Sequence, residues 1–75
     1  MNIDEFVQKF ADEFDETPIE QFSPITVFKE LEEWDSLVAL SIISMVDEVY
    51  EKRITGANIR NNKSIEDLFN FVISI

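Results

Sequence analysis

The hydroxyl of Ser36 is the side chain of this sequence best placed to do chemistry. It follows Asp35, precedes Leu37 and stands at the beginning of an apolar run. Asp is among the best N-cap residues, so this order predicts that Ser36 lies in the first turn of a helix. The free N–H groups and positive dipole end of a helix N-terminus favour a phosphate-linked group there, whereas the Asp35 carboxylate opposes it by like charge. A local interpretation stays open, in which Asp35 caps the helix, Ser36 fills the first turn and Leu37 begins a buried stripe.

The composition excludes most other chemistry. The 75 residues contain no Cys and no His, which removes thiolate catalysis, disulfides, Cys/His zinc sites and the usual base of a serine hydrolase. Sixteen Asp or Glu against six Lys or Arg give a net charge of −10, so the surface repels nucleic acid and favours a basic partner. No EF-hand loop occurs in the sequence, and we predict no metal site.

Length and apolar content indicate one small helical domain. A chain of this size buries about 60% of the surface that its unfolded form exposes, which allows one core. The 45% hydrophobic residues are too many for a disordered acidic tail, and one Gly with two Pro leaves few tight turns for a β-hairpin fold. Apolar residues at spacings of three and four, from Ile3 to Phe14, predict an amphipathic helix of about four turns that ends near Glu16.

The rest of the chain predicts a loop followed by three more helices. Residues 17–33 lose the helical period but hold many apolar residues, so we expect an ordered loop that lies on the helices, with one short turn around Phe28. A helix over residues 36–51 follows, then a short helical piece over residues 55–60. Ser64-Ile65-Glu66-Asp67 is a relative of the capping box and opens a last helix that reaches Ile75.

Asp35-Ser36-Leu37, placed directly before the middle helix of a small acidic protein, resembles the phosphopantetheine attachment motif of acyl carrier proteins. The resemblance covers nearly the whole chain, because the order of a first amphipathic helix, a long loop, a central helix, a short helix and a final helix is similar too. It implies an all-α fold, an acyl-carrier-like four-helix bundle with three long helices and one short helix, as a single carrier domain over residues 1–75.

The resemblance also implies roles for single residues. Ser36 would carry a covalent 4′-phosphopantetheine arm, donated by coenzyme A within a phosphopantetheinyl transferase, and acyl groups would be held on the arm as thioesters. Asp35 and Leu37 would help that transferase recognise the site. Leu37, Asp47 and Glu48 would contact acyl-loading and acyl-processing enzymes, although helical spacing allows burial of Leu37 within the domain equally well. The chain would then be a substrate of enzymes and not an enzyme.

The sequence departs from the pattern of many fatty-acid carriers at two places. Those proteins have Gly two residues before the Asp, whereas this chain has Glu33 there and Trp34 next. The central helix also begins with apolar residues and Ser, with acids only from Asp47 onward, which argues against standard fatty-acid synthase partners and fits a carrier of another pathway, such as a polyketide or other specialised one. We expect Trp34 to pack on the domain, and Ser41 and Ser44 to be outward polar positions.

Two other functions stay open beside the acyl carrier. A peptidyl or aminoacyl carrier would share the chemistry of Ser36, and an unmodified acidic adaptor would dock a basic protein through residues 1–38, where eleven acids and two bases lie. The first residues show neither a basic nor a long apolar segment, so we expect a soluble, cytoplasmic and monomeric protein without a membrane partner.

Overall fold

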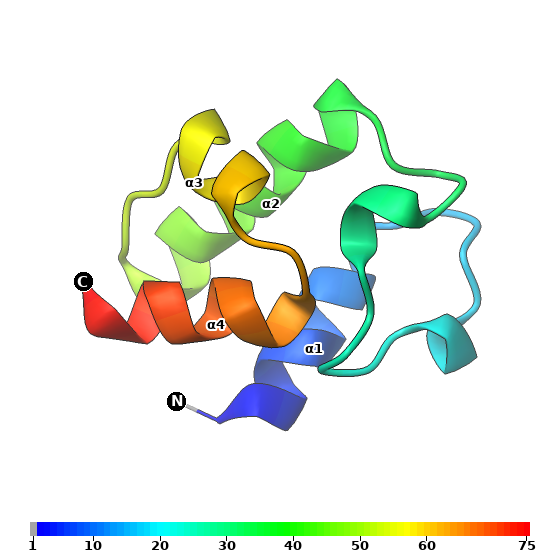
Figure 1. The fold of residues 1–75 in the computed structure, drawn as a ribbon, viewed down its shortest axis with the longest axis horizontal. Helices are drawn as coiled ribbons and strands as arrows, with labels where there is room; N and C mark the ends of the chain where they lie inside the picture. Colours follow the sequence, from blue (N-terminus) through cyan, green and yellow to red (C-terminus); the bar gives the residue numbers. More distant parts are fainter. Residues whose placement is uncertain (1) are drawn as a thin grey trace.

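The computed structural model describes residues 2–75 and holds four α-helices and two 3₁₀ turns (Figure 1). The α-helices are α1 (Ile3–Ala11), α2 (Ser36–Tyr50), α3 (Gly56–Asn61) and α4 (Ile65–Ser74). The 3₁₀ turns, η1 (Ile19–Gln21) and η2 (Phe28–Glu30), lie between α1 and α2. Within the described residues there is no strand, only an isolated antiparallel bridge between Val27 and Ser64. The prediction of a small all-α bundle with one short helix is confirmed.

Helix α1 is shorter than its apolar pattern predicts. The expectation that it continues to near Glu16 is wrong, because α1 ends at Ala11. The next N–H groups, those of Glu13 and Phe14, donate to carbonyls only three residues back, at 3.2 and 3.0 Å. These tighter turns still bring Phe14 into the core, where it is 7% exposed. The apolar spacing was therefore a reliable guide to burial but not to the helix end.

The predicted beginnings of α2 and α4 are confirmed by their caps. Asp35 Oδ1 accepts a hydrogen bond from the Val38 N–H at 2.8 Å, which satisfies one free donor of α2. Ser64 and Asp67 form a capping box at α4, in which each side chain accepts from the other residue's N–H. Helix α2 ends at Tyr50, and the following Glu51 is left-handed, with φ of 56°.

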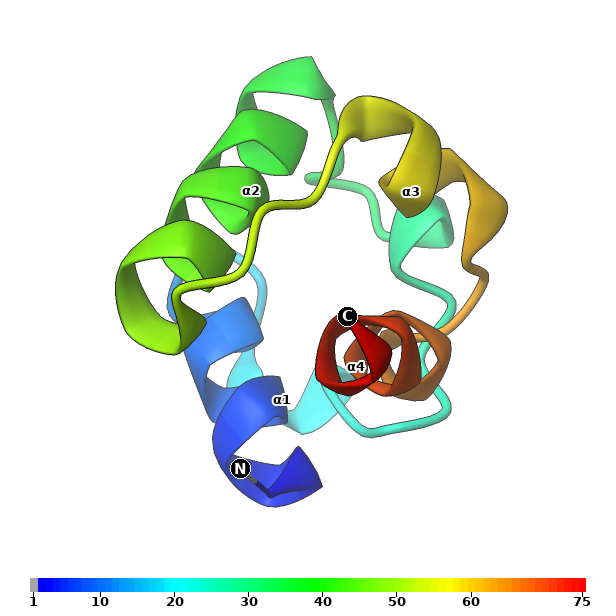
Figure 2. The same cartoon turned by 90° about the vertical axis from the view of Figure 1, so that its left-hand side faces the viewer.

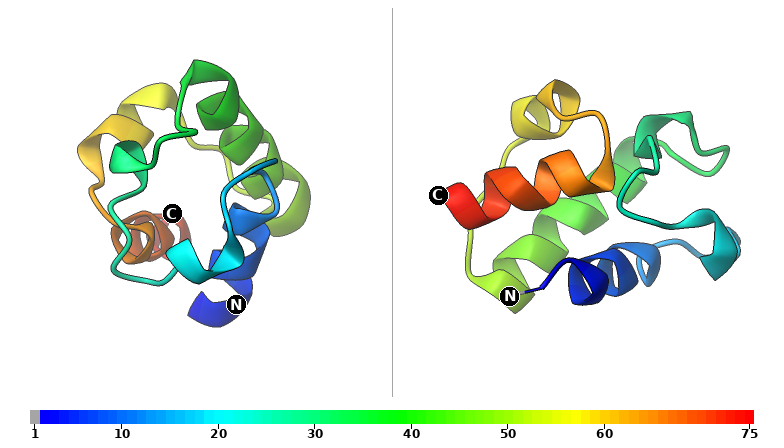
Figure 3. Two further views of the ribbon diagram at one scale, coloured as in Figure 1. Left: turned by 90° about the vertical axis from the view of Figure 1, so that its right-hand side faces the viewer. Right: turned by 60° about the horizontal axis from the view of Figure 1, so that its bottom comes forward.

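The long segment between α1 and α2 packs on the helices, as predicted. Phe22 and Phe28 are buried, and η1 is an additional turn that the sequence pattern did not predict. Figure 3 shows this segment across one end of the bundle. The N–H groups of Ile65 and Glu66, in the first turn of α4, donate to the carbonyls of Thr26 and Pro24 at 3.1 and 2.9 Å. The segment thus supplies acceptors that α4 itself lacks.

One apolar core joins all these elements. Figure 2 shows α1, α2, α3 and α4 arranged around a common centre. The side chains without exposed surface come from α1, η2, α2 and α4, and they are Phe6, Phe10, Phe28, Ile42, Val46, Ile65, Leu68 and Val72. Six of the seven Phe of the chain are linked ring to ring, in a row from Phe69 through Phe6, Phe10 and Phe14 to Phe22, with Phe28 on Phe10.

Replacing Glu51 by Gly is expected to stabilise the fold. A left-handed conformation costs a residue other than Gly about 1–2 kcal/mol, which exceeds the extra chain entropy that Gly loses on folding. We expect Glu51→Gly to raise the free energy of unfolding by about 0.5–1 kcal/mol in urea denaturation followed by circular dichroism. The control is Gln8→Gly at an exposed position inside α1, which should lower that free energy. A loss of stability in both variants would contradict the expectation.

Candidate functional site

Ser36 is the first residue of α2 and is exposed to solvent. Its position follows from its neighbours, because the Asp35 side chain caps the helix and the Asp35 carbonyl accepts the Ala39 N–H at 3.0 Å. Within residues 2–75 the Ser36 hydroxyl makes no hydrogen bond to another protein group. The site therefore offers a free alcohol at a capped helix start, and the neighbouring Asp35 carboxylate accepts from the Val38 N–H. Such an alcohol can accept a group when a second protein supplies the base.

Leu37 is also exposed, with 71% of its surface accessible. Its neighbour one turn along, Leu40, is 59% exposed. The alternative in which Leu37 belongs to the buried stripe of α2 is therefore excluded. The buried stripe of α2 instead consists of Ile42, Met45 and Val46. An exposed Leu directly after Ser36 is an apolar contact available to another molecule.

Trp34 packs on the domain, as expected. Its ring lies 6.5 Å from the Phe10 ring with nearly parallel planes, and 5.0 Å from the Phe28 ring at 59°. It is half-buried against the aromatic core. The residue before Asp35 is thus held in place by apolar contacts, which fixes the direction from which the chain enters α2.

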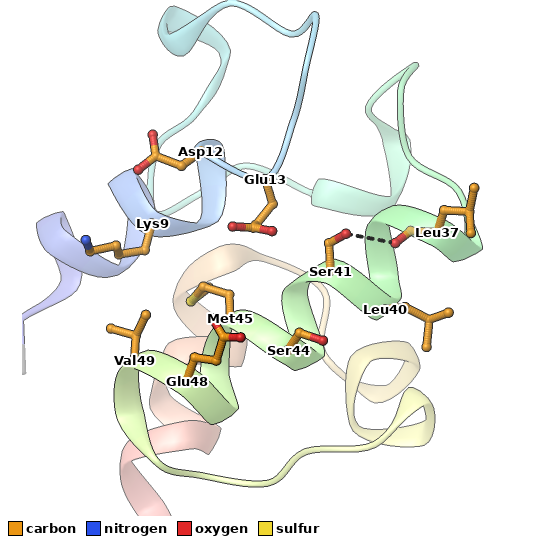
Figure 4. Close-up of a pocket in the computed structure, with 10 residues that line it drawn as sticks. All are labelled: Lys9, Asp12, Glu13, Leu37, Leu40, Ser41, Ser44, Met45, Glu48 and Val49. Carbon is orange, nitrogen blue, oxygen red and sulfur yellow. Dashed lines mark hydrogen bonds between the residues drawn. The ribbon is translucent and has the colours of Figure 1, made fainter.

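A groove of about 630 Å³ runs between the end of α1 and the length of α2 (Figure 4). Its α2 side includes Leu37, Ser41, Met45 and Glu48, and its other side is formed by Lys9, Asp12 and Glu13 at the end of α1. The structure therefore brings Leu37 and Glu48 together on one surface. Asp47, which was predicted to act with them, is exposed but does not line this groove.

The two other serines of α2 differ from Ser36. Ser41 donates its hydroxyl hydrogen bond to the Leu37 carbonyl at 3.2 Å, one turn back in the same helix. Ser44 is exposed and lines the groove. Both are outward polar positions, as predicted, but neither has the N-terminal position of Ser36.

Acidic side chains meet across the groove. Burial raises the pKa of the Glu13 carboxyl above its ordinary 4.5, and the neighbouring charges of Asp12 and Glu48 raise it further. Asp12 and Glu13 had not been predicted as site residues, because their distance in sequence from α2 gave no signal of this approach. Lys9 lines the same groove, so the surface is acidic but also carries one positive charge.

Glu33 has a structural role that its place in the sequence did not reveal. Its carboxylate accepts hydrogen bonds from the backbone N–H groups of Asp15, Glu16 and Thr17 and from the Thr17 hydroxyl, at 2.6–3.0 Å. The Thr17 hydroxyl is the main cause that lowers the pKa of Glu33 below 4.5, and the backbone donors lower it further against the opposing effect of desolvation. The Glu33 carboxylate thus accepts from backbone N–H groups that, in a longer α1, would donate to carbonyls of the helix.

Comparisons of the chain with protein-family models, with curated proteins and with solved structures found no match. Among residues 2–75, no helix has the length and apolar content that crossing a bilayer requires. In the same residues no three His, Cys, Asp or Glu side chains are grouped as metal ligands would be.

The two shifted carboxyls predict opposite effects of pH on stability. The folded chain protonates Glu13 more readily than the unfolded chain does, so stability should rise as pH falls toward and through the raised pKa of Glu13. The unfolded chain protonates Glu33 more readily, so the contribution of Glu33 should be lost as pH falls below 4.5. The melting temperature should therefore pass through a maximum on the acid side of neutrality.

Calorimetric melts across pH test this prediction with Glu13→Gln and Glu33→Gln. The first variant should lose the rise, and the second should show a shallower loss below 4.5. A wild-type melting temperature that falls steadily from neutral pH downward would show that repulsion at Glu13 does not affect stability.

Proposed function

We propose that this chain is an acyl carrier protein that holds acyl groups as thioesters on a 4′-phosphopantetheine arm attached to Ser36. The observation that carries the proposal is the exposed Ser36 hydroxyl at the first position of a 15-residue helix, between a capping Asp35 and an exposed Leu37. An all-α bundle with one short helix before the last one is compatible with the predicted carrier fold.

The modification needs a partner enzyme. Ser36 Oγ attacks the phosphorus of coenzyme A that bears the pantetheine, the new Oγ–P bond forms as the pyrophosphate P–O bond breaks, and adenosine 3′,5′-bisphosphate leaves. A base of the phosphopantetheinyl transferase takes the hydroxyl proton, since the chain has no His and the neighbouring Asp35 carboxylate caps α2 through the Val38 N–H. Coenzyme A thereby supplies the thiol that the chain, which lacks Cys, does not have.

Tethering is then the mechanism by which the protein works. A covalent arm replaces diffusional encounter by a high effective concentration of the acyl group at each partner's active site. The acyl-loading and acyl-processing enzymes would bind in turn to Leu37 and Glu48, which line the α1–α2 groove, and to the exposed Asp47 outside it. Acidic groups on such a surface favour fast, reversible docking of basic partners.

Intact-mass measurement tests the proposal against the alternatives. After incubation with coenzyme A and a broad-specificity phosphopantetheinyl transferase, the protein should gain the mass of one arm. Ser36→Ala should abolish the gain, whereas the matched controls Ser41→Ala and Ser44→Ala should retain it. An unmodified adaptor would keep its original mass, and a gain that survives Ser36→Ala would place the arm elsewhere. Loading of the arm with an amino acid in preference to an acyl group would indicate a peptidyl carrier.

Leu37 is expected to matter for partner binding and not for folding. Because its side chain is largely exposed, Leu37→Ala should change the free energy of unfolding by no more than about 0.5 kcal/mol. Loss of an apolar contact at the centre of an interface costs more than about 1 kcal/mol, so the kcat/KM of the transferase should fall at least fivefold. Ile25→Ala is the matched control, since Ile25 is 80% exposed on the loop and should have no effect on kcat/KM. Equal kinetics for the two variants would remove Leu37 from the partner surface.

A further inference from the structure

The carboxylate of Glu33 joins the segment before α2 to residues 15–17, which lie after α1 and are distant in sequence. Its Oε1 accepts from the N–H groups of Glu16 at 3.0 Å and Thr17 at 2.9 Å, and from the Thr17 hydroxyl at 2.6 Å. Its Oε2 accepts from the Asp15 N–H at 2.7 Å. All four lengths are those of good hydrogen bonds, and bonds to an ionised acceptor are roughly twice as strong as neutral ones.

The negative charge of Glu33 is needed for this arrangement. A carboxylate has two oxygens that only accept, so it can take four donors at once. The amide of Gln keeps one accepting oxygen, and an NH₂ group in the place of Oε2 would face the Asp15 N–H, which also donates. Position 33 therefore requires more than a polar side chain of the right length.

Glu33 begins a series of three consecutive anchors that lead to Ser36. The carboxylate of Glu33 holds the turn after α1, the ring of Trp34 packs on Phe10 and Phe28, and the carboxylate of Asp35 caps α2. The three side chains contact different parts of the fold, so three consecutive residues before α2 are each held by a separate interaction.

We propose that Glu33 is a positioning residue for the modification of Ser36. Its hydrogen bonds hold the segment before α2 against the turn after α1, and the transferase thus meets Ser36 on a helix start of one conformation. This role rests on the proposed carrier function. Preorganisation lowers the entropy that docking costs, so the effect belongs in the binding of the carrier and not in the chemical step.

The neighbourhood of Glu33 provides a matched control. Glu16 and Glu32 line the same surface hollow beside it, and both are exposed. The Glu32 side chain takes part in none of the hydrogen bonds to residues 15–17. Glu32→Gln and Glu33→Gln change the net charge equally at adjacent positions, and only the second replaces one of the two oxygens that accept from residues 15–17.

Steady-state kinetics of a phosphopantetheinyl transferase, with the carrier as the varied substrate at saturating coenzyme A, tests the proposal. Glu33→Gln should raise the KM for the carrier about tenfold, as expected for lost hydrogen bonds to a charged acceptor, while kcat stays near that of the wild type. Glu32→Gln should leave both constants unchanged. Equal constants for the two variants would overturn the role of Glu33 alone, whereas a wild-type chain that is never labelled would overturn the carrier function and this role with it.

Thr17→Val supplies a readout that separates positioning from loss of charge. This variant keeps the net charge and shape but removes the hydroxyl donor to Glu33, 19 positions from Ser36, and should raise KM about threefold. Combined with Glu33→Gln, its effect should be less than additive, because both changes disrupt one set of hydrogen bonds. Additive effects would show that Thr17 and Glu33 act separately and would contradict the proposal.

A titration of the wild-type protein tests the contact without any enzyme. The amide proton resonances of Asp15, Glu16 and Thr17 should shift together with the titration of the Glu33 carboxyl, followed by nuclear magnetic resonance, and that titration should lie below 4.5. In Glu33→Gln this common transition should vanish while the remaining spectrum stays dispersed. If the amide resonances of residues 15–17 in the wild-type protein do not shift with the Glu33 carboxyl, the proposal is overturned, and this result does not depend on whether the variant folds.

Discussion

The packing of the Phe10 ring is the interaction on which the rest of this structure depends. The ring contacts Phe6 and Phe14 from its own side of the fold, Phe28 from η2 and Trp34 from the segment before α2. A chain of 75 residues has room for one core only, so the same ring must hold both the helices and the long segment between them. Losing Phe10 would thus loosen the entry to α2 together with the centre of the domain.

Both apolar packing and hydrogen bonds hold the backbone before Ser36. Trp34 restrains the chain by packing, whereas Glu33 and Asp35 restrain it through hydrogen bonds to free backbone donors. The next two side chains, Ser36 and Leu37, are exposed to solvent. An exposed hydroxyl and an exposed apolar neighbour therefore follow a segment that is held by both packing and hydrogen bonds.

Sequence reasoning succeeded where the cause of a structure is local. The starts of α2 and α4 depend on caps within four residues, and both were predicted from Asp35 and from the Ser64 capping box. The end of α1 was mispredicted because the apolar spacing continues through tighter turns at residues 13 and 14, and because a remote side chain, Glu33, accepts from residues 15–17. The α1–α2 groove escaped prediction for the same reason, since it depends on how two helices pack, and the proposed role of Ser36 stays a prediction.

The bonds between the long segment and α4 have a consequence for how the domain opens. Ile65 and Glu66 donate to Thr26 and Pro24, so residues 24–27 cannot lift away without leaving two amide groups of α4 unpaired. The segment is therefore not an independently fraying loop, and its detachment and the melting of the first turn of α4 form one cooperative opening. The opening of residues 24–27 is in this way coupled to a helix that begins almost forty residues later in the sequence.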